Sequence, residues 1–365
     1  METAAVIIVF LLLVQDLLLL LLLQVNFRGV PNPQGPWPTI TLLIPCRNEE
    51  KNLPYLLASL EKLDYPEDKL QLVLGDDHSE DQTLEMLLEW SRDKSFVQVM
   101  EIAEGDGLRI NGKANALAQM AKQANGEYLL FTDADCEVPT TWLKSMVWAS
   151  RYKKADLVTG VTAIRGKTRM AAMQALDWWL TLGLVKIASD LGSSVTSMGN
   201  NMLIRKAAYE AVGGFEGIPF SLTEDFQMAK SLEAKGFCAF HLVSEGNLIF
   251  TKAQETLKGL LQQRKRWMAG AMSLPFLWRL LLFFQVVFFP AISLLVFLHP
   301  FEGLLLWLFK VIIQALFIYG FARKTMKKLN LFDLLVFEIY YLLTAWSTIV
   351  YYFWPSKTVW KGRKY

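Results

Sequence analysis

Two carboxylates, Asp133 and Asp135, stand one residue apart directly after a short apolar segment. Carboxylates at this spacing can hold one hard divalent cation, because Mg²⁺ prefers one or two carboxylates together with phosphate oxygens. Such a cation would neutralise a diphosphate leaving group, and Lys113 could add a positive charge to the same phosphates. A calcium-binding EF-hand does not fit, since Val138 replaces the loop glycine and Lys144 the closing glutamate.

A second acidic pair, Glu224 and Asp225, precedes a segment of helical character at 226–235. One interpretation is capping, because acidic residues suit the start of a helix. The other is catalytic, because the transfer of a group to a hydroxyl needs a base, and a carboxylate is a common choice. Asp225 is therefore a candidate base, with Glu224 beside it.

A third cluster, Gln263, Arg266 and Trp267, lies just before an apolar region. A basic cytoplasmic flank of a membrane helix explains part of its charge, but neither the glutamine nor the tryptophan. Arginine can clamp a diphosphate through two parallel hydrogen bonds. Tryptophan offers a flat apolar face to a sugar ring.

The elements that would position these groups alternate between strand and helix. Apolar segments predict strands at 39–45, 70–74, 97–102 and 128–132, and helical spacing predicts helices at 52–63, 81–91 and 113–124. This alternation predicts an α/β fold with a mostly parallel sheet and helices on both faces. Ligands of such sheets bind at the carboxyl ends of the strands. Four polar clusters lie near these strand ends, at 45–50, 75–81, 111–113 and 132–135, and Asp76 and Asn111 belong to two of them. Each alone is typical of a solvated turn, but together they predict a site.

Apolar residues are concentrated at the two ends of the chain. Residues 4–23 form an apolar run of about the ~20 residues that a bilayer core requires. A signal peptide is the alternative, but no basic segment precedes the run and no small-residue cleavage site follows it. A retained membrane helix is therefore favoured, in which Asp16 should face protein or the far interface. Three later runs, at 276–298, 304–321 and 331–353, predict a second membrane region.

The charges between these runs predict the orientation. The segment 323–328 is strongly basic and 299–303 carries no Lys or Arg, which places the central domain in the cytoplasm. The tail at 357–364 is also basic, although three full crossings would put it outside. Either the last run is re-entrant or interfacial, or Pro290 divides the first run of the three into an interfacial helix and a crossing.

Charge and composition give no indication of a nucleic-acid partner or a zinc site. The net charge of +2 does not favour nucleic acid as a partner. Cys46, Cys136 and Cys238 form no CxxC pair and indicate reduced thiols, and the three scattered histidines indicate no zinc site.

These motifs, in the order in which they follow one another along the chain, resemble those of the membrane-bound family 2 glycosyltransferases, which have the GT-A fold. The resemblance covers about 39–267, and the flanking membrane helices also fit. It implies that Asp77 contacts the nucleoside, that Asp133 and Asp135 bind diphosphate and metal, and that Asp225 is the base. It further implies donor contacts from Pro45, Arg47, Glu49 and Lys113, and a QxxRW motif made of Gln263, Arg266 and Trp267 that closes over donor and acceptor.

The resemblance implies an inverting transfer from a nucleotide-diphospho-sugar, most often a UDP-sugar, with Mg²⁺ or Mn²⁺. The large polymer synthases of the family usually have more membrane helices than the four apolar runs here. This difference favours a membrane lipid or lipid-linked acceptor, and the ending 360–365 resembles tails of ceramide, hopanoid or carotenoid glycosylators. A small processive synthase, such as one making poly-N-acetylglucosamine, is the main alternative. A protein that binds nucleotide-sugar without turnover is another, and a transporter fits less well.

The expected organisation has four parts. These are a membrane helix at 1–30, a cytoplasmic GT-A domain at 31–270, a membrane region at 271–356 and a basic tail at 357–365. We expect the protein in a bacterial inner membrane with its catalytic domain in the cytoplasm.

Overall fold

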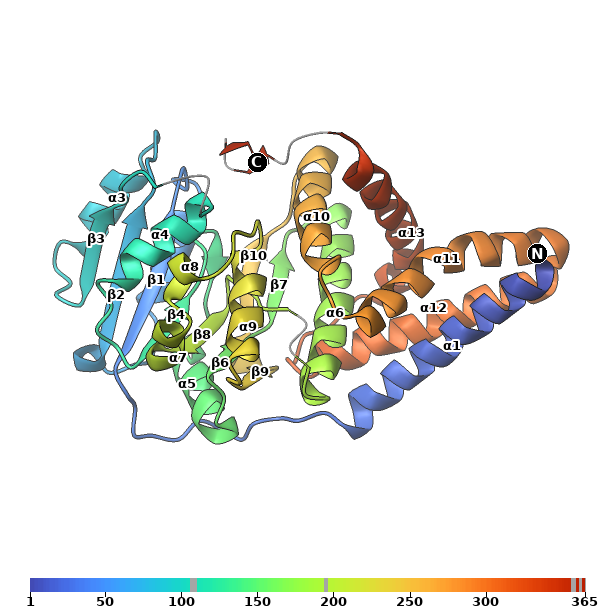
Figure 1. Cartoon of the computed structure of the whole chain (residues 1–365), viewed down its shortest axis with the longest axis horizontal. Coiled ribbons are helices and arrows are strands. Elements are labelled where there is room, and N and C mark those ends of the chain that lie inside the picture. Colours follow the sequence, from blue (N-terminus) through green and yellow to red (C-terminus); the bar gives the residue numbers. More distant parts are fainter. Residues whose placement is uncertain (106–109, 194–195, 356–358, 361–362, 365) are drawn as a thin grey trace. The chain divides into compact units, whose positions relative to one another are not determined.

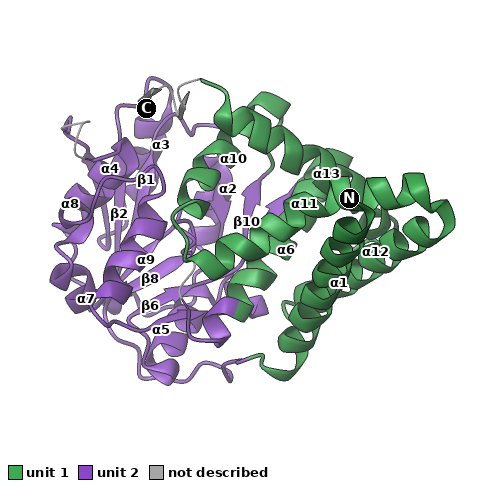
Figure 2. Ribbon diagram, turned by 45° about the vertical axis from the view of Figure 1, so that its right-hand side comes forward, with its two compact units in different colours: residues 1–27, 166–187, 253–365 green, residues 28–165, 188–252 purple. Residues whose placement is uncertain are grey.

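The computed structural model describes residues 1–105, 110–193, 196–355, 359–360 and 363–364. Most of the basic tail expected at 357–365 thus lies outside the described residues. The chain forms two compact units (Figure 2). Unit 1 comprises Met1–Phe27, Gly166–Ile187 and Ala253–Tyr365, and unit 2 comprises Arg28–Arg165 and Ala188–Lys252. Both units therefore combine segments that are far apart in the sequence.

Unit 2 is built on a seven-stranded sheet (Figure 1). The strand order is β3 (Val97–Glu101), β2 (Leu70–Asp76), β1 (Ile40–Cys46), β4 (Tyr128–Phe131), β8 (Met202–Arg205), β6 (Leu157–Thr159) and β9 (Ala239–His241). The first four strands are parallel, and β8 runs antiparallel to both of its neighbours. A smaller sheet contains β5 (Cys136–Glu137), β10 (Ile249–Lys252) and β7 (Thr162–Arg165). The mostly parallel α/β sheet expected from the sequence is confirmed.

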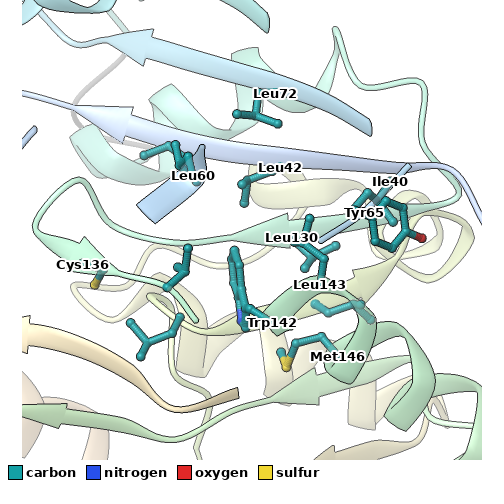
Figure 3. Close-up of a cluster of buried hydrophobic side chains, with 14 of the residues drawn as sticks. Ile40, Leu42, Leu60, Tyr65, Leu72, Leu130, Cys136, Trp142, Leu143 and Met146 are labelled. Carbon is teal, nitrogen blue, oxygen red and sulfur yellow. The ribbon is translucent and has the colours of Figure 1, made fainter. Parts of the chain in front are cut away.

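Helices cover both faces of the large sheet. On one face, Leu42, Leu72 and Leu130 pack with Trp142 and with apolar residues of α2, α3 and α5 (Figure 3). On the other face, strand side chains pack against α4, α7, α8 and α9. The alternation of side chains along each strand sends neighbouring residues to opposite cores. These helices are α2 (Leu53–Leu60), α3 (Thr83–Ser91), α4 (Gly112–Ala121), α5 (Trp142–Lys153), α7 (Lys206–Ala211), α8 (Gly214–Gly217) and α9 (Glu224–Ala234), and two short 3₁₀ turns lie at Glu67–Lys69 and Glu245–Asn247.

Unit 1 is helical and contains the four apolar runs. Among the described residues, four helices are long and apolar enough to cross a membrane: α1 (Glu2–Val25), α11 (Phe276–Leu298), α12 (Pro300–Arg323) and α13 (Leu331–Phe353). The unit also holds α10 (Leu257–Ala271) and most of α6 (Arg169–Asp190), and a short pair of strands, β11 (Val359–Trp360) and β12 (Arg363–Lys364), follows α13. Pro290 lies inside α11 and does not divide it into two helices.

Polar side chains are buried between the apolar helices. Lys310 of α12 and Glu338 of α13 form an ion pair, and their side chains are 1% and 2% exposed. Lys310 also donates a hydrogen bond to the Gln314 side chain. Gln285 of α11 donates to a carboxylate oxygen of Asp16 at 3.1 Å. Asp16 therefore faces protein, as the sequence led us to expect.

Candidate active site

The carboxyl ends of three parallel strands bring the predicted polar clusters to one edge of the sheet. In the register, Cys46 of β1 pairs with Asp76 of β2, and Leu43 of β1 pairs with Phe131 of β4. Asp77 follows directly after β2, and Asp133 lies two residues after the end of β4. The backbone N–H of Asp77 donates to the Cys46 carbonyl at 2.8 Å, which extends the pairing beyond the strands.

The loops after β1 and β2 are tied together around Asp77. Pro45 lies in β1, and the Arg47 guanidinium that follows donates to the Asp77 carbonyl at 3.1 Å and lies 3.7 Å from its carboxylate. The backbone N–H of Glu49, a buried residue, donates to the Thr83 hydroxyl at 2.8 Å. Hydrogen bonds therefore hold these two loops together, and the edge presents a positive side chain, Arg47, next to a negative one, Asp77.

Lys113 joins two acidic motifs that are far apart in the sequence. Its ammonium lies 2.5 Å from Asp133 Oδ1 and 3.4 Å from Glu224 Oε1, and its side chain is 11% exposed. Burial alone would lower the pKa of Lys113, but the nearby carboxylates, Asp133 first, outweigh it and raise the pKa. Lys113 therefore stays charged.

Asn111 fixes the positions of two of these residues, Lys113 and Glu224. Its side-chain oxygen accepts from the Ala114 N–H and caps α4, which fixes the helix that carries Lys113. Its side-chain amide donates to the Ser221 carbonyl at 2.7 Å and to Glu224 Oε2 at 3.3 Å. A single buried amide thus positions the start of α4 against the start of α9.

Asp225 lies at the start of α9 and is oriented by two backbone donors. The N–H of Gly199 donates to Oδ2 at 2.7 Å, and the N–H of Phe226 donates to Oδ1 at 2.8 Å. Loss of solvation and repulsion from Glu224 raise the pKa of Asp225 to about 6, although Lys113 and the two N–H donors oppose the rise. Such a carboxyl is ionised at neutral pH and is more basic than an ordinary aspartate.

Asp133 and Asp135 have the donor chemistry for a divalent cation. Among the described residues, no group of three or more His, Cys, Asp or Glu side chains could hold a metal. The two carboxylates would therefore need further ligands, and phosphate oxygens are those that Mg²⁺ usually takes. The pair fits a cation that binds together with a phosphate-bearing ligand.

The QxxRW residues lie in unit 1, on α10. Within unit 1, Trp267 packs edge-on against Trp178 of α6 with ring centroids 5.5 Å apart. Their neighbour Arg264 pairs with Asp177, also on α6. Gln263 and Arg266 belong to the same helix. The α10 helix is thus braced by an ion pair and a ring contact.

The family model of Glycosyl transferase family 21 matches residues 5–365. The chain belongs to this family. The match includes the acidic cluster, the QxxRW segment and the four apolar helices. The resemblance drawn from the motifs named family 2, and the matching model is that of family 21.

The relatives that the chain matches agree with its membership of a glycosyltransferase family. The chain is 28% identical over 239 residues to a poly-beta-1,6-N-acetyl-D-glucosamine synthase of Staphylococcus epidermidis, and 29% identical over 234 residues to that of Staphylococcus aureus strain COL. These matches cover 63% of this chain and 54% of each relative, so the chain spans about half the length of the curated relatives.

The fold is similar to that of the mannosyltransferase PcManGT from Pyrobaculum calidifontis, solved with GDP-Man and Mn²⁺. The TM-score is 0.61 at 19% identity, and the match covers 89% of this chain and 98% of that one. This match confirms the expected GT-A fold, and the family model and the relatives confirm the resemblance to glycosyltransferases.

Three residues of this family 21 glycosyltransferase matter more than the motifs alone suggest. Asn111 and Gly199 position charged side chains through hydrogen bonds that cross more than twenty residues of sequence. Asp76 is buried, and its Oδ1 has no hydrogen-bond partner within the part of the chain that the structure describes. The signal for Asp76 and Asn111 was their place in a polar strand-end cluster, which did not distinguish them from their neighbours.

One cavity of the described structure lies away from this site. It has a volume of about 480 Å³ and lies at the opposite edge of the sheet, with Thr39, Leu70 and Val97 at the starts of strands among its lining residues. A much smaller cavity, of about 10 Å³, is lined by Asn111, Glu224 and apolar residues of 215–220. Chemistry rather than volume therefore identifies the site.

Proposed function

We propose that this protein transfers a sugar from a nucleotide-diphospho-sugar, most simply a UDP-sugar, to a membrane lipid or lipid-linked acceptor with inversion at the anomeric carbon. The observation that carries the proposal is Asp225. It is a carboxyl with a pKa raised to about 6, aimed by two backbone N–H groups and placed beside the Lys113–Asp133 ion pair. A base and a phosphate-binding cluster at one edge of a GT-A sheet are the parts that this reaction needs.

In the proposed reaction, Asp225 accepts the proton of the acceptor hydroxyl. The hydroxyl oxygen forms a bond to the anomeric carbon while the bond from that carbon to the donor phosphate oxygen breaks. The nucleotide diphosphate leaves with the electron pair. The hydrogen bonds from Gly199 and Phe226 occupy one position on each carboxylate oxygen and leave the remaining lone pairs for the incoming proton.

The donor would lie along the strand ends. Pro45, Arg47, Glu49 and Asp77 are proposed to contact the nucleoside side, and Lys113, Asp133 and Asp135 the diphosphate. A divalent cation, Mg²⁺ or Mn²⁺, when bound by Asp133 and Asp135, would neutralise charge on the leaving group. The solved mannosyltransferase with GDP-Man and Mn²⁺ supports both the donor class and the metal. Glu224 is proposed to tune Asp225 and to hold Lys113.

The QxxRW residues are proposed to act on the same substrates. Arg266 would pair with the diphosphate through parallel hydrogen bonds. Trp267 would offer its face to a sugar ring, and Gln263 would add a polar contact. Their role rests on the sequence motif, and the brace that α6 provides to α10 is consistent with a helix that must hold a defined orientation.

The four apolar helices support a lipid or lipid-linked acceptor. We propose a bacterial inner-membrane protein whose domain at 31–270 faces the cytoplasm, with membrane segments at 1–30 and 271–356 and a basic tail at 357–365. The basic segment around Lys324, Lys327 and Lys328 supports this orientation. A second candidate, a small processive polysaccharide synthase, is favoured by the two staphylococcal relatives, both of which are poly-beta-1,6-N-acetyl-D-glucosamine synthases.

A donor screen tests the proposal. Purified protein in native-lipid membranes would receive a panel of nucleotide-sugars with Mg²⁺ or Mn²⁺, and released nucleotide diphosphate and labelled product would be measured together. We expect donor-dependent release with label in a lipid of discrete mass, and loss of both in Asp225→Asn. A high-molecular-weight product would select the processive synthase instead. Equal turnover by Asp225→Asn would refute the assignment of the base.

A further inference from the structure

Lys113 contacts carboxylates of two separate sequence motifs. Its ammonium touches Asp133, which follows β4, and Glu224, which begins α9. Asp133 is the more exposed of the two carboxylates, with 35% of its side chain exposed against 11% for Glu224. The contact with Asp133 is thus the shorter of the two but also the one open to an incoming ligand.

A divalent cation on Asp133 would oppose this contact. Such a cation binds carboxylate oxygens at about 2.1 Å, so on the same oxygen it would stand less than about 5 Å from an ammonium. Two positive charges at that distance, in a partly buried site, repel each other strongly. Lys113, like any lysine, is positively charged at neutral pH. The repulsion therefore favours its departure from Asp133 when a cation binds.

The ammonium can move without a change of backbone. The Asn111 side chain caps α4 and fixes the backbone that carries Lys113. Glu224, the second partner, is held by Asn111 as well and remains as an anchor. A lysine has a long flexible side chain, so rotation about its bonds can carry the ammonium from Asp133 to a phosphate oxygen of a bound donor.

We propose that Lys113 competes with the divalent cation for Asp133, so that the donor diphosphate, by taking the ammonium, couples its own binding to that of the cation. Without a diphosphate, the Lys113 ammonium stays on Asp133 and keeps the affinity of the site for the divalent cation low. With one, Asp133 is released to the metal and Lys113 adds its charge to the phosphates. The inference rests on the proposed function for the identity of the site, but not on the role of Asp225.

The test measures Mn²⁺ binding by electron paramagnetic resonance of the free ion, on full-length protein in detergent, with and without saturating UDP. Lys113→Met removes the ammonium and keeps the length of the side chain. We expect it to bind Mn²⁺ alone about tenfold more tightly than wild type, within the range typical of coupled sites. We also expect the factor by which UDP tightens Mn²⁺ binding to fall at least about fivefold in this variant.

Matched variants separate competition from a general loss of positive charge. Lys122→Met removes a cation at the other end of α4, where it pairs with Glu216 at 2.9 Å. We expect its affinity for Mn²⁺ alone to change by less than about threefold, since only long-range charge is lost. Lys113→Arg keeps the charge and should retain weak Mn²⁺ binding without UDP. Circular dichroism of each variant checks the fold.

Two outcomes would overturn the inference. One is a Lys113→Met variant that folds but binds Mn²⁺ alone no more tightly than wild type. The other is an equal gain in Lys122→Met, which would assign the effect to overall charge. Asp133→Asn distinguishes these from failure of the site itself, because undiminished Mn²⁺ binding by that variant would instead refute the metal site in the proposed function.

Discussion

The clearest prediction concerns Gly199, which lies against the proposed base. A Cβ atom at this position would stand 2.9 Å from Asp225 Oδ2 and 3.0 Å from the Asp225 Cβ. Both distances are shorter than van der Waals contact, so in Gly199→Ala the carboxylate must shift by some tenths of an ångström. The same oxygen accepts the Gly199 N–H at 2.7 Å, and this hydrogen bond would be lengthened or lost.

The magnitude follows from that hydrogen bond. A hydrogen bond to a charged group contributes about 1.5–3 kcal/mol, and here it favours the ionised form of the carboxyl. Its loss would raise the pKa of Asp225 by about 1–2 units, since one unit corresponds to about 1.4 kcal/mol. From a starting pKa of about 6, the acidic limb of the pH–rate profile would move to about 7–8. With the misplaced base added, we expect kcat at neutral pH to fall roughly 10–100-fold.

The assay is nucleotide diphosphate release across pH 5 to about 9. Gly320→Ala is the matched control, because a Cβ there would meet only Leu23 Cδ2, at 4.0 Å. UDP affinity should be retained in Gly199→Ala, which would show that the site is folded. An unchanged rate and an unchanged acidic limb in this variant would refute the argument that Gly199 positions Asp225.

Other perturbations should act through the contacts described above. Wild-type activity should rise with pH through about 6, because Asp225 must be ionised to accept a proton, and a pH–rate profile measures this. Glu224→Gln removes the repulsion that helps to raise the pKa of Asp225, so the same limb should move to lower pH, opposite to Gly199→Ala. Asn111→Ala removes the cap of α4 and the tether of Glu224, and should lower the free energy of unfolding by at least about 1 kcal/mol in denaturant titrations. Lys310→Met strands the buried Glu338 carboxylate and should destabilise the protein by about 3–5 kcal/mol, seen as a lower thermal midpoint in detergent, whereas pairing it with Glu338→Leu should recover most of the loss.

Local patterns sufficed for the elements that carry the site. Apolar runs that end in polar residues predicted β1, β2 and β4, and the parallel arrangement then required their carboxyl ends to meet. The run at 276–298 predicted α11 to the residue, because a long apolar helix has few competing interpretations. The predicted helices at 52–63 and 113–124 ended earlier, at Leu60 and Ala121. Helix ends depend on caps and on the turns that follow, which periodicity does not record.

Elements of two to four residues could not be predicted in the same way. β5 has two residues, and β6 and β9 have three each, which is too few for an alternation of apolar and polar side chains to be visible. The antiparallel strand β8 also escaped the prediction of a mostly parallel sheet, because its direction depends on how the chain returns to the sheet.

Contacts between distant segments were the hardest to foresee. Glu338 lies inside the last apolar run, and in the structure its charge is matched by Lys310, which lies 28 residues earlier on α12. Lys113 was expected to meet phosphates, and the structure places it between carboxylates 20 and 111 residues further along the chain. A sequence shows that such charges exist, but only the packing of the elements shows which of them neutralise each other.

The sharing of one ammonium among several carboxylates gives a physical reason for their different roles. Lys113 contacts Asp133 and Glu224 directly, whereas Asp225 is held by backbone N–H groups and feels the lysine only at longer range. Among the contacts of the described residues Asp225 has no ion pair with a cation, and loss of solvation raises its pKa to about 6. A base needs such an affinity for protons, and a metal ligand needs the opposite. The same lysine therefore treats the two carboxylates differently: it contacts the proposed metal ligand Asp133 directly, while its longer-range attraction does not prevent the rise in the pKa of the proposed base Asp225.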